Sequence, residues 1–112
     1  MATETTLVLV KPDGVQRGLI GRVLARLETK GLEIVGLKML LPPRALLEAH
    51  YAVHRERPFF ASLLSFMSSG PVVAIAARGD GAIDAVRRLM GSTHGAQASP
   101  GTIRGDFGMS KS

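Results

Sequence analysis

Three cationic side chains are the residues of this sequence best suited to chemistry on an anion. Lys11 ends an apolar run and is followed by Pro12, which fixes the backbone where the chain turns. Arg87 lies in a predicted helix, and Arg104 follows the turn-forming segment that begins at Pro100. An arginine offers a planar fork of donors and a lysine a point charge, so the three together would suit one polyphosphate. Spacing alone leaves a second interpretation open, which is three separate solvated charges.

The histidines His50, His54 and His94 make a weaker case. His50 and His54 are four residues apart in a predicted helix, a spacing that can place two imidazoles on one zinc ion. In the metalloprotease motif a glutamate follows the first histidine, whereas Tyr51 stands there in this chain, and no third ligand is evident. We therefore expect neighbouring surface histidines. His94 falls in a long loop, where it would either hydrogen-bond within the loop or face an anion.

Composition and motif searches narrow the function classes. The 112 residues carry 14 Lys+Arg and 9 Asp+Glu, and this net charge of +5 suits a phosphate compound, a nucleic acid or a membrane surface. The absence of cysteine excludes disulfides, thiolate metal sites and a cysteine nucleophile. The sequence contains no Walker phosphate loop, and the segment 79–84 has Asp84 where a dinucleotide fingerprint needs its third glycine. With four Phe, one Tyr and no Trp, it offers little surface for stacking several bases, so nucleic acid is not expected as the main partner.

The apolar runs are too short for a membrane protein. None approaches the roughly 18 residues of a membrane span, and the first residues lack the basic start of a signal peptide. Neither internal repeats nor linkers are visible. We therefore expect a cytoplasmic protein with one domain, residues 1–112, and no membrane partner.

The elements that must position the cations follow from the apolar patterns. Continuous apolar runs predict strands over residues 5–10, 34–41 and 72–77. Apolar residues at helical spacing predict helices over 19–27, 44–53, 60–67 and 83–90, the last with Ile83, Val86 and Met90 facing the core. Residues 91–106 show no periodicity, and a loop of this length is more often functional than not. The order β-α-β-α-α-β-α predicts an α+β architecture with helices on a small sheet.

Several segments together resemble one known family. In chain order they are residues 11–18 (KPDGVQRG), the His50-Tyr51 pair, and residues 57–60 (RPFF), 69–73 (SGPVV), 91–93 (GST) and 100–107 (PGTIRGDF). Each motif is weak alone, but all of them in order along the chain are highly specific. On these motifs the chain resembles the nucleoside diphosphate kinases. The resemblance implies a ferredoxin-like α+β sandwich, in which helices cover an antiparallel sheet.

The resemblance also implies an activity and a site. The reaction would be reversible, ping-pong transfer of the γ-phosphoryl group of ATP to other nucleoside diphosphates through a phosphohistidine, with Mg²⁺ on the phosphates. The assembly would be a homo-oligomer, either a hexamer or a tetramer. By motif position, Lys11 would contact the transferred phosphate, Tyr51 would support it near the nucleophile, and Phe59 would stack on the base. The β and γ phosphates would be held by Arg87, Thr93 and Arg104.

The sequence departs from the family at the nucleophile. The family's histidine belongs to an Asn-x-x-His-Gly motif that would fall after Ser112, and none of the three histidines matches it. We therefore expect the nucleophile and the last sheet strand beyond Ser112, with an unpaired apolar edge at residues 71–77 in the absence of that strand. The alternative is a catalytically inactive nucleotide-binding or assembly module of the same fold, which would bind ATP without becoming phosphorylated.

Overall fold

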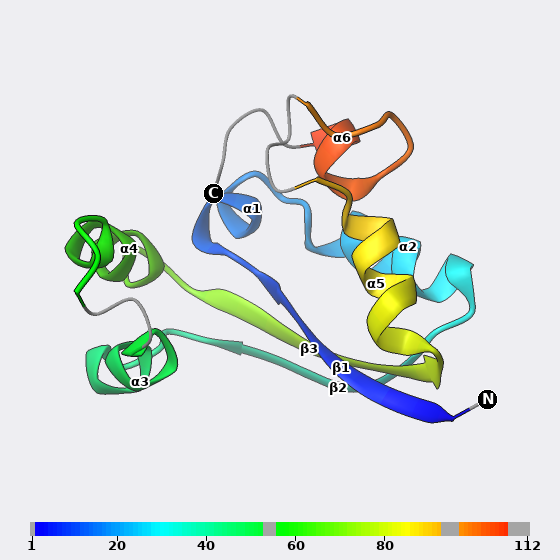
Figure 1. Cartoon of the computed structure of the whole chain (residues 1–112), viewed down its shortest axis with the longest axis horizontal. Helices are drawn as coiled ribbons and strands as arrows, with labels where there is room; N and C mark the ends of the chain where they lie inside the picture. Colours follow the sequence, from blue (N-terminus) through cyan, green and yellow to red (C-terminus); the bar gives the residue numbers. More distant parts are fainter. Residues whose placement is uncertain (1, 53–55, 93–96, 108–112) are drawn as a thin grey trace.

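An antiparallel sheet with six helices makes up the described part of the chain. The computed structural model describes residues 2–52, 56–92 and 97–107, with only the backbone of His50. The elements are β1 (Thr3–Val10), α1 (Pro12–Gln16), α2 (Ile20–Lys30), β2 (Glu33–Leu40), α3 (Arg44–His50), α4 (Phe60–Met67), β3 (Val72–Asp80), α5 (Ala82–Met90) and α6 (Ile103–Phe107). The strand order is β1-β3-β2 (Figure 1). The expected α+β architecture is therefore confirmed.

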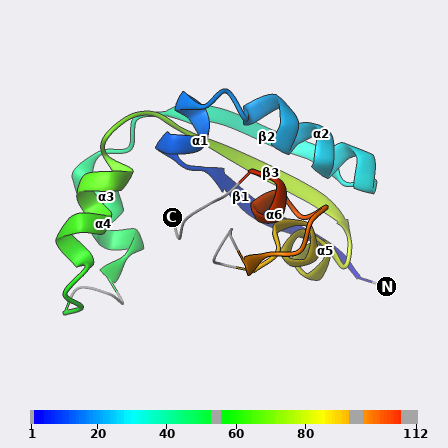
Figure 2. The same ribbon diagram turned by 90° about the horizontal axis from the view of Figure 1, so that it is seen from above.

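The main core lies between one face of the sheet and the helices α2, α5 and α6. Val8 and Val10 of β1 are buried on this face, opposite Ile75 and Val73 of β3, whereas the intervening side chains of β1 point to the other face. In Figure 2, α2 lies over the β2 side of the sheet and α5 over the β1 side. Leu27 of α2 is completely buried in this core, which fixes the helix to the sheet.

A second, smaller core joins α3 and α4 to one end of the sheet. Its buried residues are Leu47, Leu64, Met67 and Val72. Figure 1 shows this helix pair standing apart from α2 and α5, at the end where β2 leaves the sheet and β3 enters it. The molecule thus has two helical groups, one on each side of the residues that follow β1.

The longer helices agree with the sequence prediction. The helix predicted over 60–67 is α4, and α2 ends where Gly31 adopts a left-handed conformation with φ of 103° after Lys30. The helix predicted over 44–53 ends earlier, at His50, and Val53 lies outside the described residues. Ile83 is expected to face the core but is 42% exposed, because the buried face of α5 runs through Ala82 and Val86, which are four residues apart.

The prediction of an unpaired apolar edge at residues 71–77 is wrong. β3 is paired with β1 on one side and with β2 on the other, so that Val73 lies opposite both Val10 and Met39. A continuously apolar strand is typical of the centre of a sheet, where both faces and both edges are covered. Among the described strands, β1 and β2 form the edges.

Two short helices, α1 and α6, were not predicted from the sequence. Residues 11–14 were expected to form a turn, but Pro12 occupies the first position of α1, where its fixed φ favours helix and its missing N–H costs nothing. A Cβ on Gly14 would lie 2.9 Å from Val10 Cγ1, so this glycine lets α1 pack against β1. α6 falls in the stretch without periodicity, because five residues are too few to reveal a helical period.

Candidate functional site

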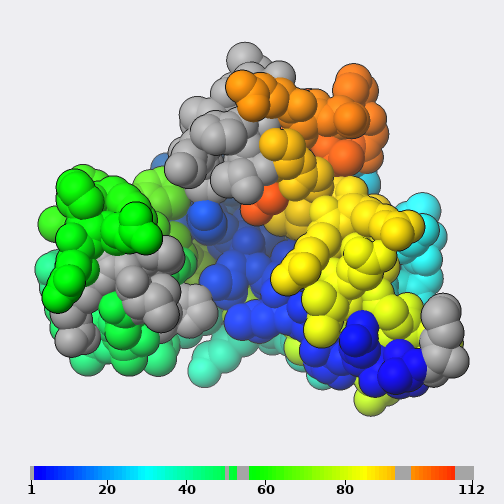
Figure 3. All heavy atoms as spheres, viewed as in Figure 1, coloured from blue at the N-terminus to red at the C-terminus, as the bar shows by residue number. Residues whose placement is uncertain are grey.

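A groove of about 140 Å³ lies at the carboxyl end of β1, between α1 and α6. Its charged lining residues are Lys11, Asp13, Arg17 and Arg104. Its floor is formed by apolar side chains of the main core, among them Val8, Val10 and Ile103. Figure 3 shows that the surface is hollowed here, between the green helix pair α3–α4 and the yellow α5, with blue residues of β1 and α1 at the bottom.

Lys11 is placed in this groove by the junction of β1 and α1. It has extended backbone angles directly before Pro12, so its side chain leaves the sheet where the strand ends. Burial lowers the pKa of the Lys11 ammonium group, the charge of Arg104 lowers it further, and Asp13 acts in the opposite direction. Lys11 therefore carries a positive charge that is only partly compensated by the groove itself.

Arg104 reaches the groove from α6 on the other side. Its Nη1 donates a hydrogen bond of 3.0 Å to the carbonyl oxygen of Gly91, the residue that follows α5. Gly91 has a φ of 82°, and a Cβ there would lie 2.6 Å from Oγ1 of Thr102. Only glycine fits at this position, so the backbone that orients Arg104 depends on it.

The structure brings together two of the three cations singled out from the sequence. Lys11 and Arg104 share the groove, whereas Arg87 is an exposed residue of α5 that is not among the described lining residues. The last residue of its helix, Met90, does line the groove, so α5 ends at the site. Thr93 lies outside the described residues.

Tyr51 and Phe59 belong to the helix pair α3–α4, and neither is among the described residues that line the groove. Tyr51 lines an apolar hollow of about 260 Å³ together with Leu47, Met67 and residues of the sheet. Burial raises the pKa of the Tyr51 phenol, so the group is neutral and can donate a hydrogen bond near neutral pH. Phe59 directly precedes α4 and is 47% exposed, whereas the neighbouring Phe60 packs against the second core.

Two groove residues, Asp13 and Arg17, received no role from the sequence. Both belong to the segment 11–18, one of the motifs that carry the family resemblance, and that was the available signal. Within the described ranges, no three or more His, Cys, Asp or Glu residues gather in a way that could bind a metal ion. His54 and the side chain of His50, to which the zinc interpretation refers, lie outside the described residues, as does His94.

The fold and the groove define an α+β protein in which Lys11, Arg17 and Arg104 line one groove at a strand end, an arrangement that suits a phosphorylated ligand. The family model for nucleoside diphosphate kinase matches residues 4–112. A nucleoside diphosphate kinase of Synechococcus sp. (strain WH7803) is 59% identical over 107 residues, which cover 96% of this chain and 70% of the relative. One of Staphylothermus marinus is 58% identical over 112 residues, 100% of this chain and 79% of the relative.

Solved structures give the same result. The chain superimposes with a TM-score of 0.94 on a halophilic nucleoside diphosphate kinase from Halobacterium salinarum in complex with CDP, at 53% identity over 97% of this chain and 72% of that one. The Aquifex aeolicus nucleoside diphosphate kinase also gives a TM-score of 0.94, at 44% identity over 98% of this chain and 80% of that one. The chain belongs to the nucleoside diphosphate kinase family. The expected ferredoxin-like fold and the phosphotransferase class are thereby confirmed.

Proposed function

We propose that Lys11 and Arg104 bind the phosphates of the nucleotide and neutralise charge during phosphoryl transfer. The supporting observation is that these two positive charges lie in one partly buried groove. The charge of Arg104 there disfavours the protonated form of Lys11. An anion bound between them would remove the repulsion. A nucleoside di- or triphosphate is the anion that an enzyme of this family handles, and two separated cations match its chain of phosphates.

The reaction requires positioning and charge compensation more than covalent help. The bond from the γ-phosphorus of ATP to its bridging oxygen breaks while a bond to a histidine nitrogen forms, and ADP leaves. A terminal phosphate oxygen of a second nucleoside diphosphate then takes the phosphoryl group from the histidine. Because charge stays on the oxygens throughout, Lys11 and Arg104 would stabilise both steps.

The remaining site residues take supporting roles in this proposal. Phe59 offers an exposed ring for stacking, which accepts any base because every base has an aromatic face. The neutral phenol of Tyr51 supports the transferred group near the nucleophile. The other two, Arg87 and Thr93, complete the contacts to the β and γ phosphates.

Magnesium fits this site as an ion carried by the nucleotide. Mg²⁺ is usually bound through one or two carboxylates and substrate phosphates, and Asp13 is the one carboxylate among the described residues that line the groove. When bound, the ion would neutralise negative charge on the phosphates. Lys11 and Arg104 would neutralise the phosphates in addition to the ion.

The enzyme would act in the cytoplasm as a homo-oligomer. Leu37 and Met39 of the edge strand β2 are both 56% exposed, and large apolar side chains at a sheet edge favour association with another copy. Light scattering of the purified natural protein would distinguish a hexamer from a tetramer. Cell fractionation would test the location.

Alanine substitution of Lys11 and of Arg104 tests the proposal. Loss of a charge-assisted phosphate contact costs about 1.5–3 kcal/mol, so Lys11→Ala and Arg104→Ala should each lower kcat/KM about tenfold to a hundredfold. Lys30→Ala and Arg88→Ala are matched controls, because both side chains are exposed and outside the groove. Equal activity of Arg104→Ala and its control would refute the assignment.

A second measurement separates an enzyme from an inactive binding module. The natural protein is incubated with labelled ATP and Mg²⁺, and acid-labile phosphoprotein is measured. Incorporation of labelled phosphate in proportion to the amount of protein supports the phosphohistidine mechanism. Nucleotide binding without incorporation of label would support the inactive binding module.

A further inference from the structure

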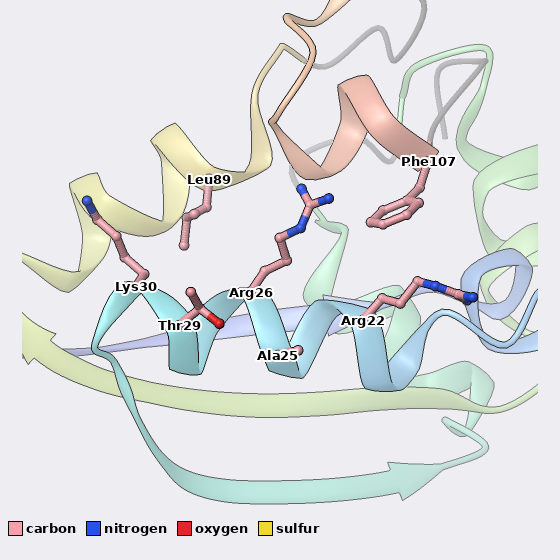
Figure 4. Close-up of a pocket in the computed structure, with 7 residues that line it drawn as sticks. All are labelled: Arg22, Ala25, Arg26, Thr29, Lys30, Leu89 and Phe107. Atoms are coloured by element: carbon pink, nitrogen blue, oxygen red, sulfur yellow. The ribbon is translucent and has the colours of Figure 1, made fainter.

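Arg26, outside the groove, is a side chain of α2 that ties α6 to this helix. It projects from α2 toward α6 and the ring of Phe107, as Figure 4 shows. Its Nη2 lies 2.5 Å from Asp106 Oδ2, and its Nη1 donates a hydrogen bond of 3.1 Å to the carbonyl oxygen of Gly101. Its guanidinium carbon lies 4.9 Å from the centre of the Phe107 ring, a cation–π contact. One side chain thus contacts both the turn before α6 and the helix itself.

Asp106 closes this network from the other side. Its Oδ1 accepts a hydrogen bond of 2.9 Å from the backbone N–H of Gly101, while Oδ2 pairs with Arg26. Arg17 holds the end of the helix, because its Nη1 donates a hydrogen bond of 2.6 Å to the carbonyl oxygen of Phe107. A helix of five residues is not stable by itself, so the position of α6 depends on such contacts.

The same short helix carries Arg104. Arg104 faces the groove and Gly91, whereas Asp106, two residues further, faces α2. Any shift of α6 therefore moves Arg104 relative to Lys11. A misplacement of about 1 Å at a catalytic contact can cost about a hundredfold in rate.

We propose that Arg26 is a positioning residue of the phosphate site: with Asp106 it locks α6 against α2 and thereby fixes Arg104 beside Lys11. The inference rests on the proposed role of Arg104 in phosphate binding. Arg26 itself touches no substrate. The side chains of Arg26 and Asp106 are 30% and 29% exposed, and partly exposed ion pairs contribute little to global stability, so the effect on the site should exceed the effect on unfolding.

The experiment compares Asp106→Ala, Arg26→Gln and Arg26→Lys with wild-type protein. We expect Arg26→Gln and Asp106→Ala to weaken CDP binding about tenfold with a small loss of thermal stability. Arg26→Lys should lie between them and the wild type, because lysine keeps the charge but lacks the fork that reaches two acceptors. The control is Arg78→Gln, which breaks another cross-element pair, Arg78–Glu33 at 2.5 Å, away from the groove.

The pKa of Lys11, followed by NMR of labelled lysine without nucleotide, provides a readout that a structural role alone would not move. The groups that shift the pKa of Lys11 are Arg104 and Asp13, besides burial, so removal of the Asp106 carboxylate by itself should not raise that pKa. Displacement of Arg104 would raise it. We expect the Asp106→Ala variant to show the raised value.

Each outcome is decisive. A lowered or unchanged pKa of Lys11 in Asp106→Ala, or equal weakening of CDP binding in the Arg78→Gln control, would overturn the positioning role. A different result is a raised pKa of Lys11 in Asp106→Ala together with normal CDP binding by Arg104→Ala. It would support the role of Arg26 in positioning Arg104 but refute the proposed contact of Arg104 with phosphate. The two failures are thus distinguishable.

Discussion

Lys11 and Arg104 meet in one groove although they are separated by most of the chain, and their proximity changes the chemistry of the lysine. Burial lowers the pKa of Lys11, and the guanidinium of Arg104 lowers it further. The two side chains come from different elements, the end of β1 and the short helix α6. The fold therefore holds two positive charges close enough to repel each other, and a bound phosphate would reduce this repulsion.

Nucleotide affinity should fall as the pH is raised, and the fall should begin at a lower pH than the ordinary pKa of a lysine would predict. Protonated Lys11 attracts the phosphates and neutral Lys11 does not. Because its pKa is lowered in the free protein, the proton is lost below the ordinary lysine value, and affinity falls as the pH rises through that point. Titration calorimetry with CDP over a range of alkaline pH would measure this decline.

The Lys11→Met variant is the control for this profile. It should bind CDP more weakly at neutral pH and should lack the alkaline decline that Lys11 causes. A wild-type decline that persists unchanged in Lys11→Met would assign the titration to another group.

Removal of the Arg104 charge should raise the pKa of Lys11, but only in part. In Arg104→Met the repulsion disappears while the burial of Lys11, the larger cause of the lowered pKa, remains. NMR titration of labelled lysine would measure the value in both proteins. An unchanged pKa, or full recovery of the ordinary value, would contradict this order of causes.

The sequence predicted the longer elements because their apolar residues repeat often enough to show a period. The runs at residues 5–10 and 72–77 and the helix at 60–67 all exist, within a few residues at their ends. The unpaired edge predicted at residues 71–77 was wrong, because strand order depends on pairing between distant segments. The central place of β3 became visible only when Val73 was seen opposite residues of both neighbours.

The site was predictable to a smaller extent, for a related reason. Residue type singled out Lys11, Arg87 and Arg104 as candidate phosphate ligands, and the structure places Lys11 and Arg104 in one groove but not Arg87. Arg26 gave no signal, since it looks like any charged residue on the solvent side of an amphipathic helix. Its role depends on Gly101 and Asp106, which only the folded chain brings to α2.

Gly105→Ala should damage the site through a steric clash. A Cβ at Gly105 would lie 2.0 Å from the carbonyl oxygen of Ser99 and 2.7 Å from Thr102 Oγ1, so the backbone before α6 would have to move. We expect a loss of stability of about 1–3 kcal/mol and weaker CDP binding, since Arg104 is the adjacent residue. Urea unfolding and calorimetry would measure the two effects.

Gly21→Ala is the matched control. Gly21 lies in α2, and a Cβ there would meet no atom within 4 Å. Alanine in a helix is favoured over glycine by about 0.5–1 kcal/mol, so this variant should be more stable and bind CDP normally. Equal behaviour of the two variants would show that the close approach at Gly105 has no effect on the site.

The contribution of Asp106 to stability should disappear in acid. The hydrogen bond from the Gly101 backbone N–H, and after it the one from Arg26, lower the pKa of Asp106 below its ordinary value. A carboxylate with a lowered pKa stabilises the folded state above its unfolded pKa, and this stabilisation is lost as the pH falls through the folded pKa. Asp106→Asn should therefore be less stable than the wild type at neutral pH, and the difference should shrink on acidification. Urea unfolding of both proteins at several pH values would measure it, and a difference that stays constant or widens in acid would show that the Asp106 carboxylate does not hold α6 in place.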